Sequence, residues 1–378
     1  MILQNKHIAI VGGGPGGLTL ARLLQRKGAD VKLYERDADK HARVQGSPLD
    51  MHEKSGVAAL HEAGLTDTLN AHVHTGADKK IITNEKAEIC FSDHGIKTAS
   101  APEIDRGELR KILLESLQSE TVVWDSYFTS LEPHNQGWLL NFKNGSTAYA
   151  DVVIAADGAN SKIRPYITDV KPRYSGFLML EIFVPDAEIS APGIWKLLNG
   201  GKVMAFGNSK CILGGQKGTG DLGFYLSFKA DENWSANSGL NFSDKQQLLP
   251  WFRSAYAKWS PAWEEIINSA AMPLIPRPIY YMPDEVWPPL PNLTMLGDAA
   301  HVMPPFAGEG ANTAMRDALE LSGLLTGNAY ESIHKAIMAF EKNMRKRSSL
   351  ATQQSLRNGE RMHSENALDQ MLAIFGNS

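Results

Sequence analysis

The chain has 378 residues, of which 43% are hydrophobic and 21% charged, and its 38 basic and 42 acidic side chains leave a formal charge of −4. This length suggests two packed domains or one large α/β body with an insertion, and the charge balance disfavours a nucleic-acid-binding protein, which would carry a basic surplus. The two cysteines, Cys90 and Cys211, lie too far apart in the chain for a CxxC redox pair or a cysteine-rich zinc site, so we predict no metal and exclude a flavin disulfide reductase.

The N-terminus is hydrophobic, but it lacks the pattern of a signal peptide. Lys6 and His7 interrupt the apolar run, and no small-residue cleavage site follows. Nowhere do about 18 apolar residues follow one another without a charge, as a membrane-spanning helix would require. We therefore expect a cytoplasmic protein with no membrane partner.

The first motif is a glycine-rich turn between a strand and a helix. A β-branched run from His7 to Val11 ends in Gly12-Gly13-Gly14-Pro15-Gly16-Gly17, a helix follows as far as Gly28, and a second strand from Val31 to Tyr34 is closed by Glu35. Residues without a Cβ let backbone N–H groups approach a pyrophosphate, and the carboxylate can accept hydrogen bonds from a ribose diol. The order of these elements predicts dinucleotide binding, against the alternative of a fortuitous glycine turn, and by itself does not separate FAD from NAD.

Two segments further along the chain carry weaker signals. Asp105 to Glu108 has the pattern of a capping box and predicts the start of a helix. After a predicted strand, Val152 to Ala155, comes the motif Asp157-Gly158-Ala159-Asn160-Ser161, with Arg164 three residues later. Taken alone, this second motif is explained equally well by an Asp-Gly turn that ends a strand, followed by a helix capped by Ser161.

Between Phe177 and Phe228 the pattern changes to short runs of strand-forming residues separated by turn residues. This pattern predicts an antiparallel sheet inserted into the α/β body. A proline-rich segment, Met272 to Pro291, then returns the chain to the first domain.

The third motif follows a predicted strand from Leu293 to Leu296. It consists of Gly297-Asp298-Ala299-Ala300-His301, a loop that contains Pro305 and Gly308, and a helix that begins near Gly310. A carboxylate at a strand end can hold a polyol chain, and N–H groups at a helix start can offset negative charge on a ring above them. Helix packing explains the small residues of this helix equally well, but it does not explain Asp298.

A long amphipathic helix carrying Ile333, Ile337, Phe340 and Met344 closes the predicted fold. Its basic run of Lys342, Arg345, Lys346 and Arg347 is interpreted as a solvated helix face.

In this order, the three motifs resemble those of the single-component, or class A, FAD-dependent aromatic monooxygenases of the para-hydroxybenzoate hydroxylase type. In that family the first motif holds the adenosine diphosphate of FAD, DGxxSxxR serves FAD and NAD(P)H binding, and the GD motif contacts the ribityl chain. The resemblance implies an α/β fold, with a Rossmann-like FAD-binding domain, an inserted antiparallel-sheet substrate domain and a long C-terminal helix. The expected bounds are 1–75, 101–172 and 272–325 for the FAD-binding domain, 76–100 and 173–271 for the substrate-binding domain, and 326–378 for C-terminal helices that bridge the two.

Within this family the chain is most similar to the tetracycline-inactivating monooxygenases, or tetracycline destructases. The matching stretches are YERDADKHARVQGSPLDMH, DRGELRKILLESL, TVVWD and LGDAAHVMPPFAGEGAN. The likeness implies that Arg43 contacts NADPH, that Asp50 and Arg106 lie on the flavin side, and that Asp298 binds the ribityl chain. A surface charge, a turn residue and the first residue of a helix are the ordinary explanations of Arg43, Asp50 and Arg106. The expected cofactor-binding residues are Gly12, Gly14, Pro15, Gly17, Glu35, Arg36, Arg43, Asp50, Arg106, Asp157, Asp298, Gly310, Ala311 and Asn312.

The likeness weakens where a tetracycline would bind. The destructases present a Gln, an Arg and a His from the inserted sheet, whereas an ungapped alignment here gives Glu181, Lys202 and Gly223. Glycine deletes a hydrogen-bond partner, and lysine lacks the planar fork of arginine. The expected substrate-binding residues are Glu181, Lys202, Gly223, Phe224, Pro305, Gly308 and Met362, with large apolar side chains from Phe177, Trp195 and Phe206 alongside.

The resemblance implies that NADPH or NADH reduces bound FAD. It also implies that O2 then forms a flavin C4a-hydroperoxide, whose distal oxygen passes to a phenolic or polycyclic substrate. A tetracycline antibiotic that is hydroxylated in this way would be inactivated. The protein's tasks in this reaction are to exclude water from the peroxide and to orient the acceptor carbon. Because these tasks depend on placement and not on acid–base chemistry, we predict no catalytic residue and expect His301 to have a structural role. No second GxGxxG appears, so NAD(P)H would bind without a Rossmann domain of its own.

Three alternatives stay open: a hydroxylase of another aromatic metabolite, a flavin dehydrogenase or reductase on the same scaffold, and a flavin-binding redox sensor. We expect a monomer whose partners are its small-molecule substrate and O2.

Overall fold

The computed structural model describes residues 2–42, 49–73, 79–93 and 102–376. Its first body is a five-stranded parallel sheet in the order β17-β11-β1-β2-β7. The strands are β1 (His7–Val11), β2 (Asp30–Tyr34), β7 (Val122–Val123), β11 (Val152–Ala155) and β17 (Leu293–Met295). Parallel strands need cover on both faces, which is why β1, β11 and β17 are nearly continuous runs of buried aliphatic residues.

Helices pack on this sheet, and smaller sheets flank it. Helix α1 packs against α11, α4 and α2. The helices are α1 (Pro15–Arg26), α2 (Ala58–Glu62), α3 (Thr66–His72), α4 (Arg106–Glu115), α10 (Asp298–His301) and α11 (Gly310–Thr326), with a π-helical turn at Glu53–Val57 and 3-10 turns at Arg164–Tyr166 and Pro305–Ala307. The flanking strands are β8 (Phe128–His134), β9 (Gly137–Phe142) and β10 (Thr147–Ala150) in one sheet, and the pair β3 (Leu49–Asp50) and β6 (Glu103–Ile104) in another.

The second body is a seven-stranded sheet in the order β16-β12-β15-β14-β13-β4-β5. Its strands are β4 (Lys80–Asn84), β5 (Ile89–Asp93), β12 (Arg173–Val184), β13 (Lys202–Gly207), β14 (Lys210–Gln216), β15 (Leu222–Lys229) and β16 (Ile275–Tyr281). All neighbours are antiparallel except β13 and β4, which run parallel, so the predicted antiparallel sheet is present with one parallel pair. Because β16 pairs with β12, the chain stays in this sheet as far as Tyr281, beyond residue 272 where we expected it to leave.

The two faces of the second sheet have different partners, since successive side chains of a strand point to opposite faces. Leu180, Ile182 and Phe224 belong to a core with Phe252 of α8 and Ile266 of α9. The helices around this outer core are α5 (Ala187–Ser190), α6 (Pro192–Leu198), α7 (Trp234–Asn237), α8 (Lys245–Ala255) and α9 (Glu264–Asn268), with a 3-10 turn at Pro261–Trp263.

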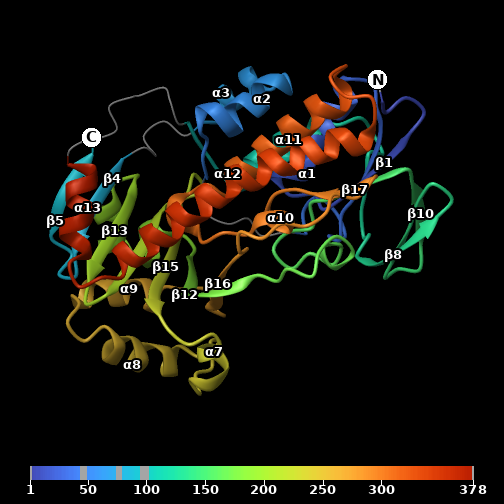
Figure 1. Cartoon of the computed structure of the whole chain (residues 1–378). Coiled ribbons are helices and arrows are strands. Elements are labelled where there is room, and N and C mark those ends of the chain that lie inside the picture. The colour runs from blue at the N-terminus through green and yellow to red at the C-terminus, as the bar shows by residue number, and fades with distance from the viewer. Residues whose placement is uncertain (1, 43–48, 74–78, 94–101, 377–378) are drawn as a thin grey trace.

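The inner face of the second sheet packs toward the first body. Phe177, Met179 and Phe206 form a core with Phe306 and Met362. Helix α12 (Ile333–Met362) runs from α11 to this inner face, and α13 (Ala367–Phe375) packs beside β13 and β4 (Figure 1). Within the described part of the chain, no helix is both long and apolar enough to cross a membrane.

Candidate active site

In the glycine turn after β1, two glycines permit close packing of the backbone and a third faces open space. A Cβ on Gly12, whose φ is +112°, would lie 2.2 Å from the carbonyl oxygen of Ala156, and one on Gly17 would lie 2.1 Å from that of Gly12. A Cβ on Gly14 would meet nothing within 4 Å. Gly14 stands at the N-cap of α1, and Pro15 is its first residue. The open space therefore lies at a helix N-terminus, where N–H groups bind anions such as a pyrophosphate.

Glu35, the predicted ribose ligand, is 2% exposed and bonded to the glycine turn. Its carboxylate accepts hydrogen bonds from the N–H of Gly13 at 2.6 Å and from that of Asp37 at 3.1 Å. The acid thus fixes the turn to the end of β2. Arg36 follows it on the exposed surface, and the predicted NADPH contact Arg43 lies outside the described residues.

The second motif joins the loop after β11 to the third motif. Asp157 accepts a hydrogen bond from the N–H of Lys162 at 2.9 Å, and burial raises the pKa of its carboxyl group. The guanidinium of Arg164 is buried and donates to the carbonyls of Ala299 at 2.7 Å and Asp298 at 3.0 Å. Arg164 was outside the expected site residues, although its place in the DGxxSxxR motif was a signal for it.

The third motif brings the predicted ribityl ligand to the start of α11. Gly297 has φ +59°, and the exposed side chain of Asp298 begins α10. A Cβ on Gly310 would lie 3.9 Å from the Oδ1 atom of Asp298. The first N–H groups of an α-helix, here those of Gly310 and Ala311, have no partner within the helix. A carboxylate and a set of N–H donors therefore lie side by side.

Asn312 has a structural role that the sequence did not indicate. Its side chain is 1% exposed, donates to the carbonyl of Asp50 at 2.7 Å and accepts from the N–H of His52 at 2.9 Å. The amide is therefore committed to holding residues 50–52 against α11. This leaves the backbone, and not the side chain, of Asn312 to face a cofactor.

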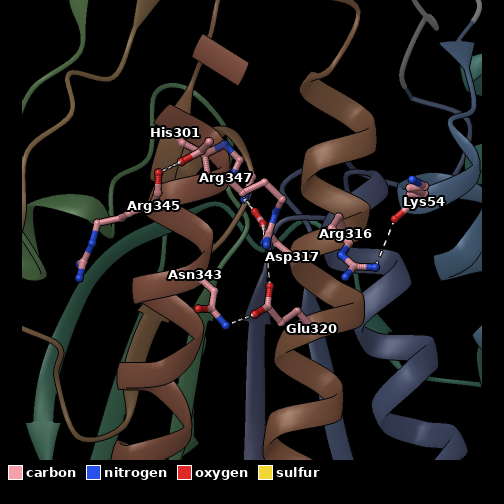
Figure 2. A network of polar contacts seen from close by, with 10 residues as sticks. Lys54, His301, Arg316, Asp317, Glu320, Asn343, Arg345 and Arg347 are labelled. Carbon is pink, nitrogen blue, oxygen red and sulfur yellow. Dashed lines mark hydrogen bonds and ion pairs between the residues drawn. The ribbon is translucent and has the colours of Figure 1, made fainter. Parts of the chain in front are cut away.

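A buried charge network supports the third motif from below (Figure 2). Asp317 of α11 is fully buried, and its Oδ2 atom accepts from the N–H of Gly297 at 3.1 Å and lies 2.5 Å from Nε2 of His301. Its Oδ1 atom pairs with Arg347 of α12 at 2.7 Å, and Arg347 also pairs with Glu320 at 2.7 Å. The network ties the loop after β17 to two helices.

Burial by itself would raise the pKa of Asp317, but His301 and Arg347 outweigh it and hold that pKa below its usual value. Burial likewise opposes the charge of His301, but Asp317 outweighs it and raises the pKa of the histidine. These contacts give His301 the structural role that we expected.

The prediction of a solvated basic face on α12 was wrong for two of its four residues. Arg347 pairs with buried Asp317, and Arg345 pairs with Glu341 at 3.5 Å and lies over the Trp287 ring at 4.9 Å. Lys342 and Lys346 are exposed, as expected. The difference arises because Arg347 meets a carboxylate of α11, whereas Arg345 pairs with Glu341 one turn earlier in α12 and stacks on Trp287.

On the inner face of the second sheet, three of the predicted substrate residues lie close together. Phe183, Gly223, Gly215 and Lys202 follow one another in register across β12, β15, β14 and β13. Glu181 lies one row away on the same face, where Arg277 of β16 pairs with its carboxylate at 2.8 Å. Two adjacent glycines thus leave one row of this face without side chains between Phe183 and Lys202.

Lys202 joins the second sheet to the first body. Its ammonium lies 2.8 Å from a carboxylate oxygen of Asp50 in β3 and 2.6 Å from one of Glu103 in β6. Burial would lower the pKa of Lys202, but the two carboxylates outweigh it and raise that pKa. The predicted substrate contact Lys202 and the predicted flavin-side residue Asp50 are therefore ion-paired with each other.

Phe224 does not belong to the inner face, and its assignment to the substrate site was wrong. It is fully buried in the outer core, with its ring against Gly214, and Trp195 of α6 packs against the same core. The reason is parity, because Phe224 follows Gly223 in β15 and must point to the opposite face.

The remaining predicted residues fall on both sides of the contact between the bodies. Pro305 and Gly308 are exposed on the loop before α11, whereas Met362 is 2% exposed and belongs to the inner core. Arg106 is half-buried as the first residue of α4, and Asp105 precedes it without the capping hydrogen bond that we predicted. Among the described residues, no group of three or more His, Cys, Asp or Glu side chains is arranged to hold a metal ion.

The sequence matches the family described as FAD binding domain over residues 5–184 and 292–352. Similar curated proteins include 6-hydroxynicotinate 3-monooxygenase of Pseudomonas fluorescens, 26% identical over 92% of this chain and 89% of the relative, and 3-amino-4-hydroxybenzoate 2-monooxygenase of Streptomyces cremeus, 27% identical over 86% and 80%.

Two solved structures share the fold. HpxO of Klebsiella pneumoniae, complexed with FAD and uric acid, superposes with a TM-score of 0.78 at 20% identity over 99% of this chain and 93% of its own. Tetracycline destructase Tet(55) superposes with a TM-score of 0.78 at 19% identity over 100% and 96%. With the glycine turn, the buried acid and the GD loop in place, the chain belongs to the FAD-binding family and is an FAD-dependent enzyme of the monooxygenase type.

Proposed function

We propose that the enzyme consumes NADPH or NADH and hydroxylates a small hydroxylated aromatic ring, a phenol or a hydroxypyridine. The observation that carries this proposal is the contact between the loop after the GD motif and the inner face of the sheet, where the rings of Phe306 and Phe177 lie 5.1 Å apart. Relatives at 26–27% identity are named as monooxygenases of 6-hydroxynicotinate and 3-amino-4-hydroxybenzoate, which are rings of this kind.

FAD would bind through the elements already described. The N–H groups around Gly14 would take the pyrophosphate, Glu35 and Arg36 would lie at the adenosine, and Asp157 and Asp298 would hold the ribityl side. The N–H groups of residues 310–312 would face the ring system. Bound FAD would accept electrons from NAD(P)H and activate O2. Arg43 is our candidate for a contact to the nicotinamide cofactor, and Arg106 is our candidate for a contact to the flavin.

The chain's own contribution is placement, and we assign no acid or base. Met179 and Met204, with the half-buried Tyr225 and Leu213, give the inner face an apolar surface on which a ring can lie. Pro305 and Gly308 would close it from the flavin side, so that water is kept from the reacting atoms and the target carbon is held in place.

A tetracycline is the second candidate. It is favoured by the stretch from Pro305 to Asn312, which nearly repeats that of the destructases, whereas Gly223 supplies no hydrogen-bond partner and Glu181 is already engaged by Arg277. The test is NADPH oxidation by FAD-loaded enzyme across phenols, hydroxypyridines and tetracyclines, with mass spectrometry of the products. We expect a product that is one oxygen atom heavier from a small ring. Turnover of tetracycline alone would reverse the choice, and no stimulation by any compound would contradict the function.

A further inference from the structure

Three cationic side chains of the second sheet bear on the proposed substrate site, and they differ in their partners. Lys202 is held by Asp50 and Glu103, and Arg277 is held by Glu181. Lys217, at the end of β14, has no ion pair or side-chain hydrogen bond to any residue that the structure describes. Its ammonium lies over the ring of Phe183, 4.7 Å from the centroid.

The position of Lys217 is fixed by the turn between β14 and β15. Its N–H donates to the carbonyl of Asp221 at 2.9 Å, and its carbonyl accepts from Gly220 at 3.1 Å. Phe183 is in register with Gly223 and Gly215 on the inner face, so the ammonium lies at the end of the row that lacks side chains. The charge therefore lies at the edge of the inner face, beside the row in which Gly215 and Gly223 carry no side chains.

The carboxylates that influence this ammonium belong to both bodies. Burial lowers the pKa of Lys217, and the carboxylates of Asp221, Asp105 and Glu181 oppose that shift without forming an ion pair with it. Asp105 stands at the start of α4, in the first body, whereas Glu181 belongs to the inner face. A half-buried cation without a paired carboxylate gains more from a bound anion than one already neutralised, because its charge is partly desolvated.

We propose that Lys217 binds an anionic group of the substrate, and that the substrate is an aromatic ring bearing a carboxylate. The carboxylate lies on the ammonium over Phe183, and the ring extends from there along the inner face beside Gly223. This inference rests on the proposed function, since it names the class of ring that the enzyme hydroxylates.

The test compares acids with their amides. Binding of 6-hydroxynicotinate, 4-hydroxybenzoate and the corresponding carboxamides to FAD-loaded enzyme is measured by calorimetry, and KM and kcat follow from NADPH oxidation. We expect the wild type to bind an acid roughly ten- to a hundredfold more tightly than its amide, as a charge-assisted contact provides. Lys217→Met should remove that preference through Kd and KM with little change in kcat for the amide, and Lys217→Arg should restore most of it.

Lys210→Met is the matched control. Lys210 begins the same strand, is half-buried with a pKa lowered by burial, and lies over the ring of Tyr256 at 5.6 Å, away from the glycine row. It should leave the preference unchanged. A wild type with no preference for acids, or a preference that survives Lys217→Met, overturns the inference. If only neutral phenols bind and are hydroxylated, the inference fails while the proposed function stands. If no aromatic compound or tetracycline stimulates NADPH oxidation, both fail.

Discussion

The glycine turn of the first body and the inner face of the second sheet are built on different principles. At the turn, backbone groups face the open space, and the nearby charge of Glu35 is buried beneath, bonded to the N–H of Gly13. On the sheet, the charged side chains themselves face the site, and most are matched in pairs such as Lys202 with Asp50. The glycine turn recognises its ligand by shape, which suits a group that does not change, such as the pyrophosphate of FAD. The inner face of the sheet recognises its ligand by charge, so a few substitutions can redirect it to another substrate.

The largest effect that the comparison predicts is at Gly17. Gly17→Ala places a Cβ 2.1 Å from a backbone oxygen that no side-chain rotation can move, and should cost more than about 3 kcal/mol and prevent FAD loading. Gly14→Ala is the matched control, because its Cβ meets no atom within 4 Å, and it should keep the thermal midpoint of the apoprotein while weakening FAD binding. Thermal unfolding and flavin content of both variants measure this. Equal midpoints for the two variants would contradict the division of the turn.

Arg347→Met tests whether charge is essential beneath the cofactor loop as well. It removes one of the two charged partners of the fully buried Asp317 and should reduce the free energy of unfolding by about 3 kcal/mol, the lower end for a broken buried pair because His301 remains. Lys346→Met, at an exposed neighbour, should change it by less than about 0.5 kcal/mol. Denaturant titration of the two variants distinguishes them. An equally small change in the free energy of unfolding for both variants would mean that Arg347 belongs to the solvated helix face that the sequence predicted.

His363 makes the stability of the second sheet depend on pH. It donates from Nδ1 to the carbonyl of Gly359 at 2.7 Å, and its Nε2 atom lies 2.8 Å from the Ser227 hydroxyl. Burial lowers the pKa of His363 to about 4, below the usual value of 6.5.

Because the unfolded chain binds this proton first, the contribution of His363 to stability is complete above pH 6.5 and is lost as the pH falls toward 4, by roughly 3 kcal/mol in all. His363→Gln should flatten this part of the profile of unfolding free energy against pH. Parallel profiles for variant and wild type would mean that the histidine does not titrate as described.

Asp298→Ala is expected to have the smallest effect of the four, and one confined to the cofactor. The exposed carboxylate has no partner among the described residues, so its removal should leave the apoprotein as stable as the wild type. The lost hydrogen bond to FAD should weaken binding by about 1.5 to 3 kcal/mol, or roughly ten- to a hundredfold. Titration of the apoprotein with FAD measures it, and unchanged affinity would make Asp298 a turn residue.

The sequence predicted what depends on neighbours in the chain. The order of β1, the glycine turn, α1, β2 and Glu35 was readable because each element is local, and the GD loop followed from its own spacing. The sequence did not predict the ion pair between Asp50 and Lys202 or the hydrogen bond from Asn312 to the Asp50 carbonyl, because these contacts join residues far apart in the chain. Phe224 was assigned wrongly for a simpler reason. Successive residues of a strand point to opposite faces of the sheet, so Phe224 points away from the inner face.

The most direct test of the proposed function uses isotopically labelled O2 with FAD-loaded enzyme, NADPH and a hydroxylated aromatic acid. Product isolated from labelled O2 should contain one labelled oxygen atom, and none when only the water is labelled, while anaerobic mixtures should give no product. Product that forms without O2, or that takes its oxygen from water, would make the enzyme a dehydrogenase or a water-dependent hydroxylase on this fold and contradict the monooxygenase account.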